Sequence, residues 1–198
     1  RLLNEAAALR LLKERTTIPV PTVYSYEPDD QGAMRLVVKR IHGIKAASVG
    51  EECRMPVGSR HVTSGTCSAC ENIATEKVNI FVEGTVLPQL RRLTSNQTGL
   101  DGFVLPPPRI EEYDRRAMWP PKQSPLEGEY VFCHGDLSRS NIMVDPNTLD
   151  VVYIIDWEQA GFFPATLERP LWRLDYREYM QTYEDHDMLD GEIALITG

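Results

Sequence analysis

Apolar and polar positions in the first part of the chain follow helical spacing and then strand spacing. Residues 4–15 place alanine and leucine on one helical face after Asn4, which is a good N-cap. Two prolines end this helix, and residues 22–27 and 33–41 have the composition of two strands separated by turn residues. The pattern therefore predicts a helix followed by a β-hairpin.

The next stretch, residues 45–71, shows neither helical nor strand spacing and is rich in serine, glycine and threonine. It predicts a long loop without a core pattern, which we expect to be mobile because little apolar burial offsets the entropy of ordering it. Three cysteines and a histidine in it include the metal-type spacing Cys-x-x-Cys, but the other pair is irregularly spaced. The sequence therefore favours reduced thiols over a zinc site at Cys53, His61, Cys67 and Cys70.

Helical spacing returns over residues 72–93, where Gly84 and Pro88 favour a break or two shorter helices. The segment around Trp172 and Tyr179 also looks helical. Short strand patterns lie between these helical segments, at residues 129–133, 141–145 and 151–156. This alternation indicates an α+β protein without internal repeats.

Bulk composition is that of a folded chain, with 198 residues, 42% hydrophobic residues and a formal net charge of −8. No lysine and arginine cluster marks a nucleic-acid surface, and no apolar stretch is long enough to cross a bilayer. We therefore expect no nucleic acid and no membrane as partners, and a cytoplasmic location because no secretory signal is visible. Residues 157–198 hold nine acidic residues against three basic ones, which favours a cationic partner.

Three polar residues between two apolar runs carry the candidate chemistry. Asn141 stands at the start of one strand and Asp156 at the end of the next, so an antiparallel hairpin would bring both to one open end. Their amide and carboxylate oxygens are ligands that Mg²⁺ takes when it also binds phosphates. Asp136 precedes Asn141 by five residues, where a carboxylate can orient and deprotonate an attacking hydroxyl.

The motifs "HGDLSRSN" and "IIDWE", residues 134–141 and 154–158, resemble the catalytic loop and metal-binding segment of aminoglycoside phosphotransferases and choline-kinase-like enzymes, which have a protein-kinase-like fold. The resemblance implies that Asp136 is the catalytic base, that Asn141 and Asp156 bind Mg²⁺, and that His134 supports the loop. It further implies ATP as the phosphoryl donor and a hydroxyl group of a small molecule as the acceptor.

The resemblance extends to the N-terminal residues. It implies that Glu5 is the helix acid that pairs with a strand lysine, and that a hinge meets adenine through Lys39, Arg40 and Ile41. The glycine-rich loop and the lysine strand that precede this helix in the family have no counterpart in the sequence. We therefore expect these residues alone to bind Mg·ATP weakly.

The implied architecture is an α+β, protein-kinase-like fold with a partial N-lobe of one helix and a β-hairpin, and a mostly helical C-lobe. The expected divisions are an N-lobe and hinge at 1–43, an irregular insertion or loop at 44–71 and a C-lobe at 72–198. Glu158 could contact a cationic substrate or brace the loop.

Two other functions stay open at this point. One is an inactive kinase-like remnant, because the glycine-rich loop and lysine strand are missing. The other is a metal-dependent phosphoesterase, which the singly scattered histidines disfavour because a two-metal centre needs several together.

Overall fold

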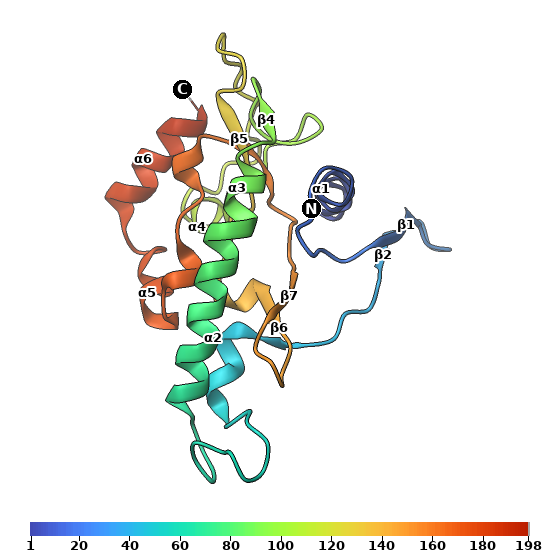
Figure 1. The fold of residues 1–198 in the computed structure, drawn as a ribbon. Helices are drawn as coiled ribbons and strands as arrows, with labels where there is room; N and C mark the ends of the chain where they lie inside the picture. The colour runs from blue at the N-terminus through green and yellow to red at the C-terminus, as the bar shows by residue number, and fades with distance from the viewer. Residues whose placement is uncertain (198) are drawn as a thin grey trace.

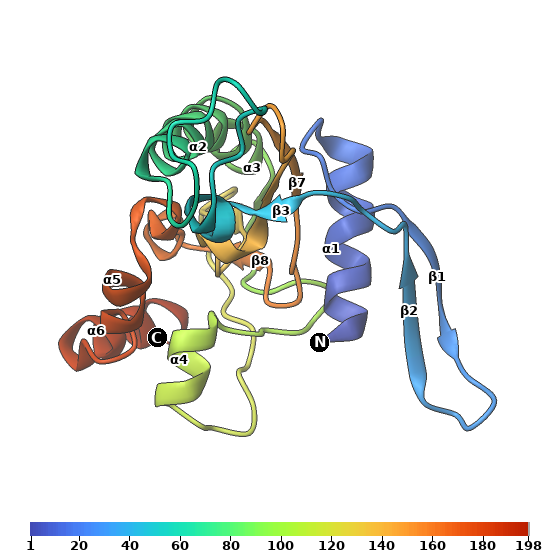
Figure 2. The same ribbon diagram turned by 90° about the horizontal axis from the view of Figure 1, so that it is seen from below.

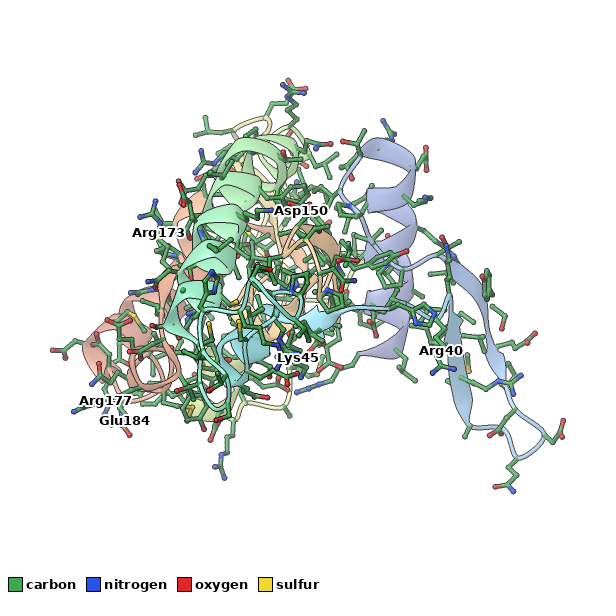
Figure 3. The ribbon with its side chains drawn as sticks, turned by 60° about the horizontal axis from the view of Figure 1, so that its bottom comes forward. Arg40, Lys45, Asp150, Arg173, Arg177 and Glu184 are labelled. Carbon is green, nitrogen blue, oxygen red and sulfur yellow. The ribbon has the colours of Figure 1, made fainter. Side chains whose placement is uncertain are left out.

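The computed structural model describes residues 1–197, which form a small N-terminal unit and a larger body. The small unit consists of α1 (Leu2–Arg15) and an antiparallel hairpin of β1 (Val23–Pro28) and β2 (Met34–Val38). Figure 2 shows α1 between this hairpin and the larger body. An extended segment, residues 39–43, joins the two, with Arg40 beside the hairpin and Lys45 at the larger body (Figure 3). The predicted helix and hairpin are confirmed.

Asn4 has a different role from the one that its position predicted. The helix begins two residues earlier and its N-cap is Arg1, so Asn4 lies inside the first turn. Its side chain is buried and points across to the larger body. A tertiary contact has therefore taken the place of the expected local cap.

The larger body is built around a long helical rod that crosses the centre of Figure 1. The rod starts at Ser68 and passes without interruption through a π-helical turn, where Gly84 and Pro88 predicted a break. Pro88 lacks the N–H that an α-helix requires, and widening the helix by one π turn accommodates this. Helical elements of the larger body are η1 (Ala46–Glu51), α2 (Ser68–Phe81), η2 (Val82–Val86), α3 (Leu87–Leu90), α4 (Pro108–Tyr113), η3 (Arg139–Asn141), η4 (Ala165–Leu167), η5 (Leu171–Arg173), α5 (Tyr176–Gln181) and α6 (His186–Thr197).

Two small three-stranded sheets flank this rod. Their orders are β3-β6-β7 and β4-β5-β8, and every pairing is antiparallel. The predicted hairpin is confirmed as β6–β7, in which Ile142 pairs with Ile154. The strands are β3 (Ile44–Lys45), β4 (Thr94–Ser95), β5 (Tyr130–Cys133), β6 (Ile142–Val144), β7 (Val151–Ile154) and β8 (Gly161–Phe163).

The expectation that residues 45–71 lack a core pattern is wrong. Ala46 and Val49 of η1 are buried, as are Cys67 and Cys70 at the start of α2, and all four join the main hydrophobic core. Burial of both ends removes the reason for expecting the whole stretch to be mobile. The apolar positions were missed because they are few, small and separated by a polar loop at 52–66.

No helix in the described part of the chain is long and apolar enough to span a membrane.

Candidate active site

The β6–β7 hairpin brings Asn141 and Asp156 to one end of the sheet. Asn141 is the last residue of η3, directly before β6, and its carbonyl oxygen accepts a hydrogen bond of 2.9 Å from the N–H of Ile155. Asp156 is the next residue after Ile155 and its side chain is exposed. Antiparallel pairing thus makes neighbours of two residues that are far apart in sequence.

Asp136 lies against Asn141. The Nδ2 group of Asn141 donates to the Asp136 carbonyl oxygen at 2.9 Å and to its carboxylate Oδ2 at 3.0 Å. Because the amide nitrogen faces Asp136, the Oδ1 atom of Asn141 is left as a ligand for a cation.

The other carboxylate oxygen of Asp136 is held by an aromatic pair. Tyr179 of α5 donates its hydroxyl to Oδ1 at 3.1 Å, and the hydroxyl of Tyr183 lies 2.8 Å from that of Tyr179. Burial raises the pKa of Tyr179, so the phenol stays protonated and acts as a donor. No sequence pattern predicts this contact, because Tyr179 is one of several aromatic and apolar positions in a segment with helical spacing.

His134 connects the two motifs. Its imidazole is fully buried, its Nδ1 accepts the N–H of Asp136 at 3.2 Å, and its Nε2 lies 2.9 Å from the carbonyl oxygen of Ile155. A ring that accepts at Nδ1 must carry its proton on Nε2, so Nε2 donates to Ile155. Burial lowers the pKa of His134, which keeps the ring neutral as this arrangement requires.

The backbone conformation beside and at the site residues also helps to set their positions. Gly135 has φ +88°, and a Cβ there would meet the Gln159 carbonyl oxygen at 3.1 Å, so glycine is required by both conformation and space. Asp156 has φ +67°, an unfavourable conformation for a residue with a side chain. The buried indole of Trp157 anchors the turn beside it by donating to the Ile154 carbonyl oxygen at 3.0 Å. Strained residues held by well-packed neighbours are typical of functional sites.

Glu5 of α1 lies close to Asp156 and Glu158. Burial and then the charges of these two carboxylates raise the pKa of Glu5. Of these three acidic groups, Glu158 forms an ion pair with Arg1, and no ion pair of Glu5 or Asp156 with a side chain is found within residues 1–197. Such a cluster is suited to a bound cation.

Glu158 itself braces the N-terminal unit. Its Oε1 accepts from Arg1 at 2.6 Å, and its carbonyl oxygen accepts from Nδ2 of Asn4 at 3.0 Å. The same Nδ2 group donates a second hydrogen bond, of 2.7 Å, to the carbonyl oxygen of Ala160. Of the two roles left open for Glu158, these contacts favour the bracing role.

The three hinge residues lie apart from this acidic cluster. Lys39, Arg40 and Ile41 form the extended segment after β2, and the N–H of Lys39 donates to the Thr22 carbonyl oxygen at 2.7 Å. Lys39 lines a hollow between the end of α1 and Tyr153 of β7.

A buried ion pair behind the catalytic loop was not expected from the sequence. Arg109 of α4 donates to both carboxylate oxygens of Glu192 on α6, at 2.8 and 3.0 Å, and also to the Gly135 carbonyl oxygen at 3.2 Å. A single arginine after three prolines carries no local signal of this role. Through the bond from Arg109 to Gly135, the pair is tied to the backbone of the loop next to Asp136.

A hollow of about 180 Å³ borders the catalytic loop. Ser138, Arg139 and Tyr179 line it beside Asp136, and Glu71 and Asp175 place acidic groups on its wall. Part of the wall comes from Ala47 of η1 and Glu71 of α2, two residues of the stretch expected to be a loop.

Comparisons with known proteins agree with this arrangement. Residues 71–168 match the model of the phosphotransferase enzyme family. An aminoglycoside 3'-phosphotransferase from Streptomyces fradiae is 29% identical over an alignment of 181 positions, which covers 81% of this chain. The chain spans 59% of the length of that relative.

Solved structures define the class of fold. A thermostable mutant of the aminoglycoside phosphotransferase APH(4)-Ia, in complex with AMP-PNP and hygromycin B, aligns with a TM-score of 0.51. It is 11% identical, and the alignment covers 97% of this chain and 70% of that one. The apo form of such a mutant gives a TM-score of 0.50 at 12% identity, covering 98% and 71% of the two chains. The chain has the protein-kinase-like fold of these enzymes. Its resemblance to the aminoglycoside phosphotransferase family is confirmed.

Proposed function

We propose that this protein transfers the γ-phosphoryl group of ATP, with Mg²⁺, to a hydroxyl group of a cationic small molecule. The observation that carries the proposal is the convergence of Asp136, Asn141 and Asp156 at one end of the β6–β7 hairpin. The family match at residues 71–168 supports phosphoryl transfer as the reaction class.

Asp136 acts as the base in this proposal. Hydrogen bonds from Asn141 to Oδ2 and from Tyr179 to Oδ1 hold its carboxylate in one orientation. Each carboxylate oxygen has a further lone pair, so a substrate hydroxyl can still donate to it. The carboxylate then accepts the hydroxyl proton as the oxygen attacks phosphorus.

The metal-binding groups fit a hard cation. Asp156 offers an exposed carboxylate and Asn141 offers Oδ1. Glu5 adds an acidic neighbour, whose pKa is raised by burial and then by the charges of Asp156 and Glu158. When bound, Mg²⁺ neutralises charge on the phosphate oxygens of ATP. His134 holds the base and one metal ligand relative to each other, because its ring accepts the N–H of Asp136 and donates to the carbonyl oxygen of Ile155, directly before Asp156.

The nucleotide contacts in this proposal come from α1 and from the segment after β2. Glu5 would face the phosphate side through its position near Asp156, and the backbone of Lys39, Arg40 and Ile41 would meet adenine, as the family resemblance implies. APH(4)-Ia has been solved with AMP-PNP and with ADP, each together with hygromycin B, which supports ATP as the donor here.

The acceptor is placed in the hollow beside Asp136. Glu71 and Asp175 on its wall favour a positively charged molecule, although Arg139 partly offsets Glu71 across a 3.6 Å ion pair. The acidic balance of the C-terminal residues favours the same class of acceptor.

Two substitutions separate the roles of the acids. Asp136→Asn should lower turnover by about a hundredfold or more and leave Mg·ATP affinity unchanged, because only proton transfer is lost. Asp156→Ala should weaken Mg·ATP binding itself, because a metal ligand is lost. Turnover is followed by ADP release with aminoglycosides as acceptors and a neutral polyol for comparison, and binding is followed by calorimetry.

Asp150→Asn is the matched control, because Asp150 is exposed and forms a surface ion pair with Lys77 away from the three acids. Asp150→Asn should change neither turnover nor Mg·ATP affinity. Wild-type turnover in Asp136→Asn would exclude Asp136 as the base, and unchanged Mg·ATP affinity in Asp156→Ala would exclude the metal role.

A further inference from the structure

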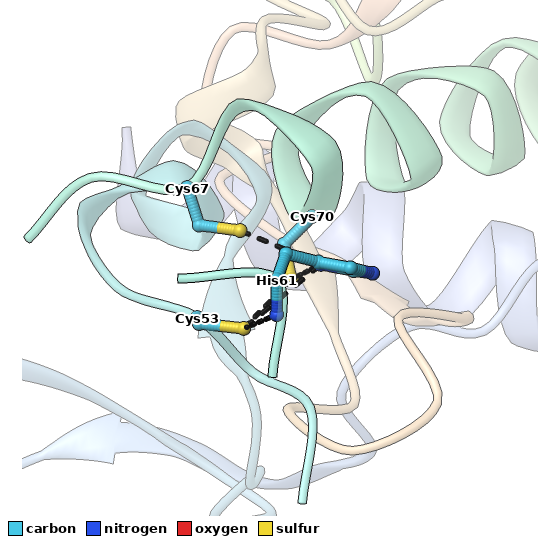
Figure 4. A group of neighbouring side chains, drawn as sticks. All are labelled: Cys53, His61, Cys67 and Cys70. Atoms are coloured by element: carbon cyan, nitrogen blue, oxygen red, sulfur yellow. Dashed lines mark hydrogen bonds between the residues drawn. The ribbon is translucent and has the colours of Figure 1, made fainter. Parts of the chain in front are cut away.

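Four potential metal ligands from the loop before α2 and from the start of this helix converge at one point. The Nδ1 atom of His61 lies 3.5 Å from the sulfur atoms of Cys67 and Cys70 and 3.9 Å from that of Cys53 (Figure 4). The sulfur atoms of Cys53 and Cys70 are 4.0 Å apart, and all four ligand atoms lie within 4.8 Å of one another. The four residues lie within 18 consecutive positions of the sequence, so the local fold of this segment brings them together.

These distances are those of a tetrahedral zinc site. With Zn–S bonds of about 2.3 Å and Zn–N bonds of about 2.0 Å, tetrahedral geometry places sulfur atoms about 3.8 Å apart and sulfur and nitrogen about 3.5 Å apart. The separations of Nδ1 of His61 from the sulfur atoms of Cys67 and Cys70 match the second value, and its separation of 3.9 Å from Cys53 is longer. The Cys53–Cys70 separation is close to the first value. All four cysteines of the chain are free thiols in the structure. Three thiolates with one imidazole in this geometry select zinc over Mg²⁺ or Ca²⁺.

Backbone groups around the cluster stabilise the charged form of the ligands. The N–H of His61 donates to the Cys53 sulfur at 3.3 Å, and the N–H of Arg54 donates to the Cys70 sulfur at 3.4 Å. Cys67 is the N-cap of the 14-residue helix α2 and Cys70 lies in its first turn, where the helix dipole favours negative charge. Both features favour thiolates, which are the form that binds zinc.

We propose that Cys53, His61, Cys67 and Cys70 form a structural zinc site. Four protein ligands leave no open coordination position, so the ion has a structural role rather than a catalytic one. The sequence alone did not favour this site, because Cys53 and His61 lack a regular spacing and only the fold brings them to the Cys-x-x-Cys pair.

The zinc site would fix one wall of the hollow beside Asp136. The N–H of Cys67 donates to the Gly50 carbonyl oxygen at 2.8 Å, which ties the cluster to η1. One residue after Cys70, Glu71 pairs with Arg139 of the catalytic loop at 3.6 Å. The ion would therefore order the loop at 52–66 and hold η1 and the start of α2 against the catalytic loop.

Metal content and cobalt spectroscopy test the proposal. The full chain, produced with zinc and purified without chelator, should contain one zinc ion per chain by mass spectrometry of the metal. Replacement by Co²⁺ should give the intense visible bands of a tetrahedral thiolate site. His61→Ala and Cys67→Ser should each lower zinc affinity at least about a hundredfold.

Controls distinguish loss of the site from loss of the fold. Cys133→Ser changes a buried cysteine outside the cluster, and His42→Ala changes an exposed histidine, so both should keep one zinc ion. His61→Cys supplies a fourth thiolate and should also keep the ion, with a cobalt spectrum shifted toward that of four sulfur ligands.

Three results would overturn the proposal. One is a folded wild-type chain that takes up neither zinc nor cobalt. Another is a disulfide between two of the three cysteines in the chain as isolated from cells, found by peptide mass mapping. The third is one zinc ion retained in a Cys67→Ser and His61→Ala double variant, because the ion would then lie elsewhere.

Discussion

Single residues behind the catalytic loop hold its backbone rather than its reactive side chain. Glu168 accepts the N–H groups of His134 and Gly135, and Arg109 donates to the Gly135 carbonyl oxygen. The Oε1 atom of Glu168 is buried and has no hydrogen-bond partner in residues 1–197, although other atoms of the residue reach solvent. Burial raises the pKa of Glu168 to about 7. This carboxyl group therefore changes charge near neutral pH.

The raised pKa predicts a pH-dependent stability. Glu168 binds its proton more tightly in the folded chain than in the unfolded one, where a Glu has a pKa of about 4.3. The protonated carboxyl group of Glu168 contributes to the free energy of unfolding fully below about pH 4.3. This contribution, roughly 3 kcal/mol in total, is lost as the pH rises through about 7. Glu168→Gln stays neutral and can still accept the backbone N–H bonds, so its free energy of unfolding should fall less over this range.

Denaturant unfolding at several pH values from about 5 to 8 measures this difference. Glu184→Gln, at an exposed position, is the control and should follow the wild-type pH profile. Parallel profiles for wild type and Glu168→Gln would show that Glu168 does not titrate in this range.

Among the elements, α4 and α6 are joined by a buried ion pair as well as by apolar packing. Arg109 and Glu192 are 2% and 6% exposed and make two parallel hydrogen bonds. Ile110, Leu189 and Ile196 pack around them in the second hydrophobic cluster. A pair in such surroundings is costly to break, because removing one partner leaves a buried charge.

Arg109→Met should lower the free energy of unfolding by about 3–5 kcal/mol, since Glu192 then stays buried without its bidentate partner. Arg169, 3.6 Å from Glu192, offsets part of the loss. The double variant Arg109→Met and Glu192→Met should recover most of the stability, because neither charge remains. Denaturant unfolding gives these values.

Arg173→Met is the matched control, because its ion pair with Glu83 lies on the surface and should contribute at most about 1 kcal/mol (Figure 3). Equal, small losses for Arg109→Met and Arg173→Met would show that the buried pair does not stabilise the fold.

Across the whole molecule, the N-terminal unit is attached to the larger body by a shared core and a few polar contacts. Leu9 and Leu12 of α1 belong to the same hydrophobic cluster as Ile154 and Trp157 of the larger body. The two hydrogen bonds of Asn4 to carbonyl oxygens of residues 158 and 160 lie beside this core. They place α1, and with it Glu5, against the segment that carries Asp156.

Asn4→Leu removes both hydrogen bonds and leaves two carbonyl oxygens without their partner. Each unsatisfied group costs about 1–3 kcal/mol, so α1 should open more often from the larger body. Amide hydrogen exchange should rise at least about tenfold in α1 and in residues 155–161, while α2 stays protected.

Arg10→Leu, on the exposed face of the same helix, is the control and should leave exchange unchanged. A uniform rise of exchange over the whole chain in Asn4→Leu would mean that Asn4 supports global stability rather than the placement of α1.

Local sequence patterns determined those parts of the protein that depend on neighbours along the chain. Helical spacing predicted α1, and alternation with turn residues predicted the β1–β2 and β6–β7 hairpins. Because a hairpin returns to its starting point, the sequence also predicted that Asn141 and Asp156 lie at one end. The motif resemblance assigned their roles, which stay predictions.

Tertiary structure decided what depends on contacts between distant segments. The bond from Tyr179 to Asp136, the Arg109–Glu192 pair and the place of Asn4 each join residues at least 43 positions apart, which no local periodicity records. The cluster of Cys53 and His61 with the Cys-x-x-Cys pair spans a shorter stretch, but it forms in a loop with no repeating spacing. The physical reason is the same in both cases: side-chain chemistry is set by the sequence, while its convergence is set by how the core and the loops pack.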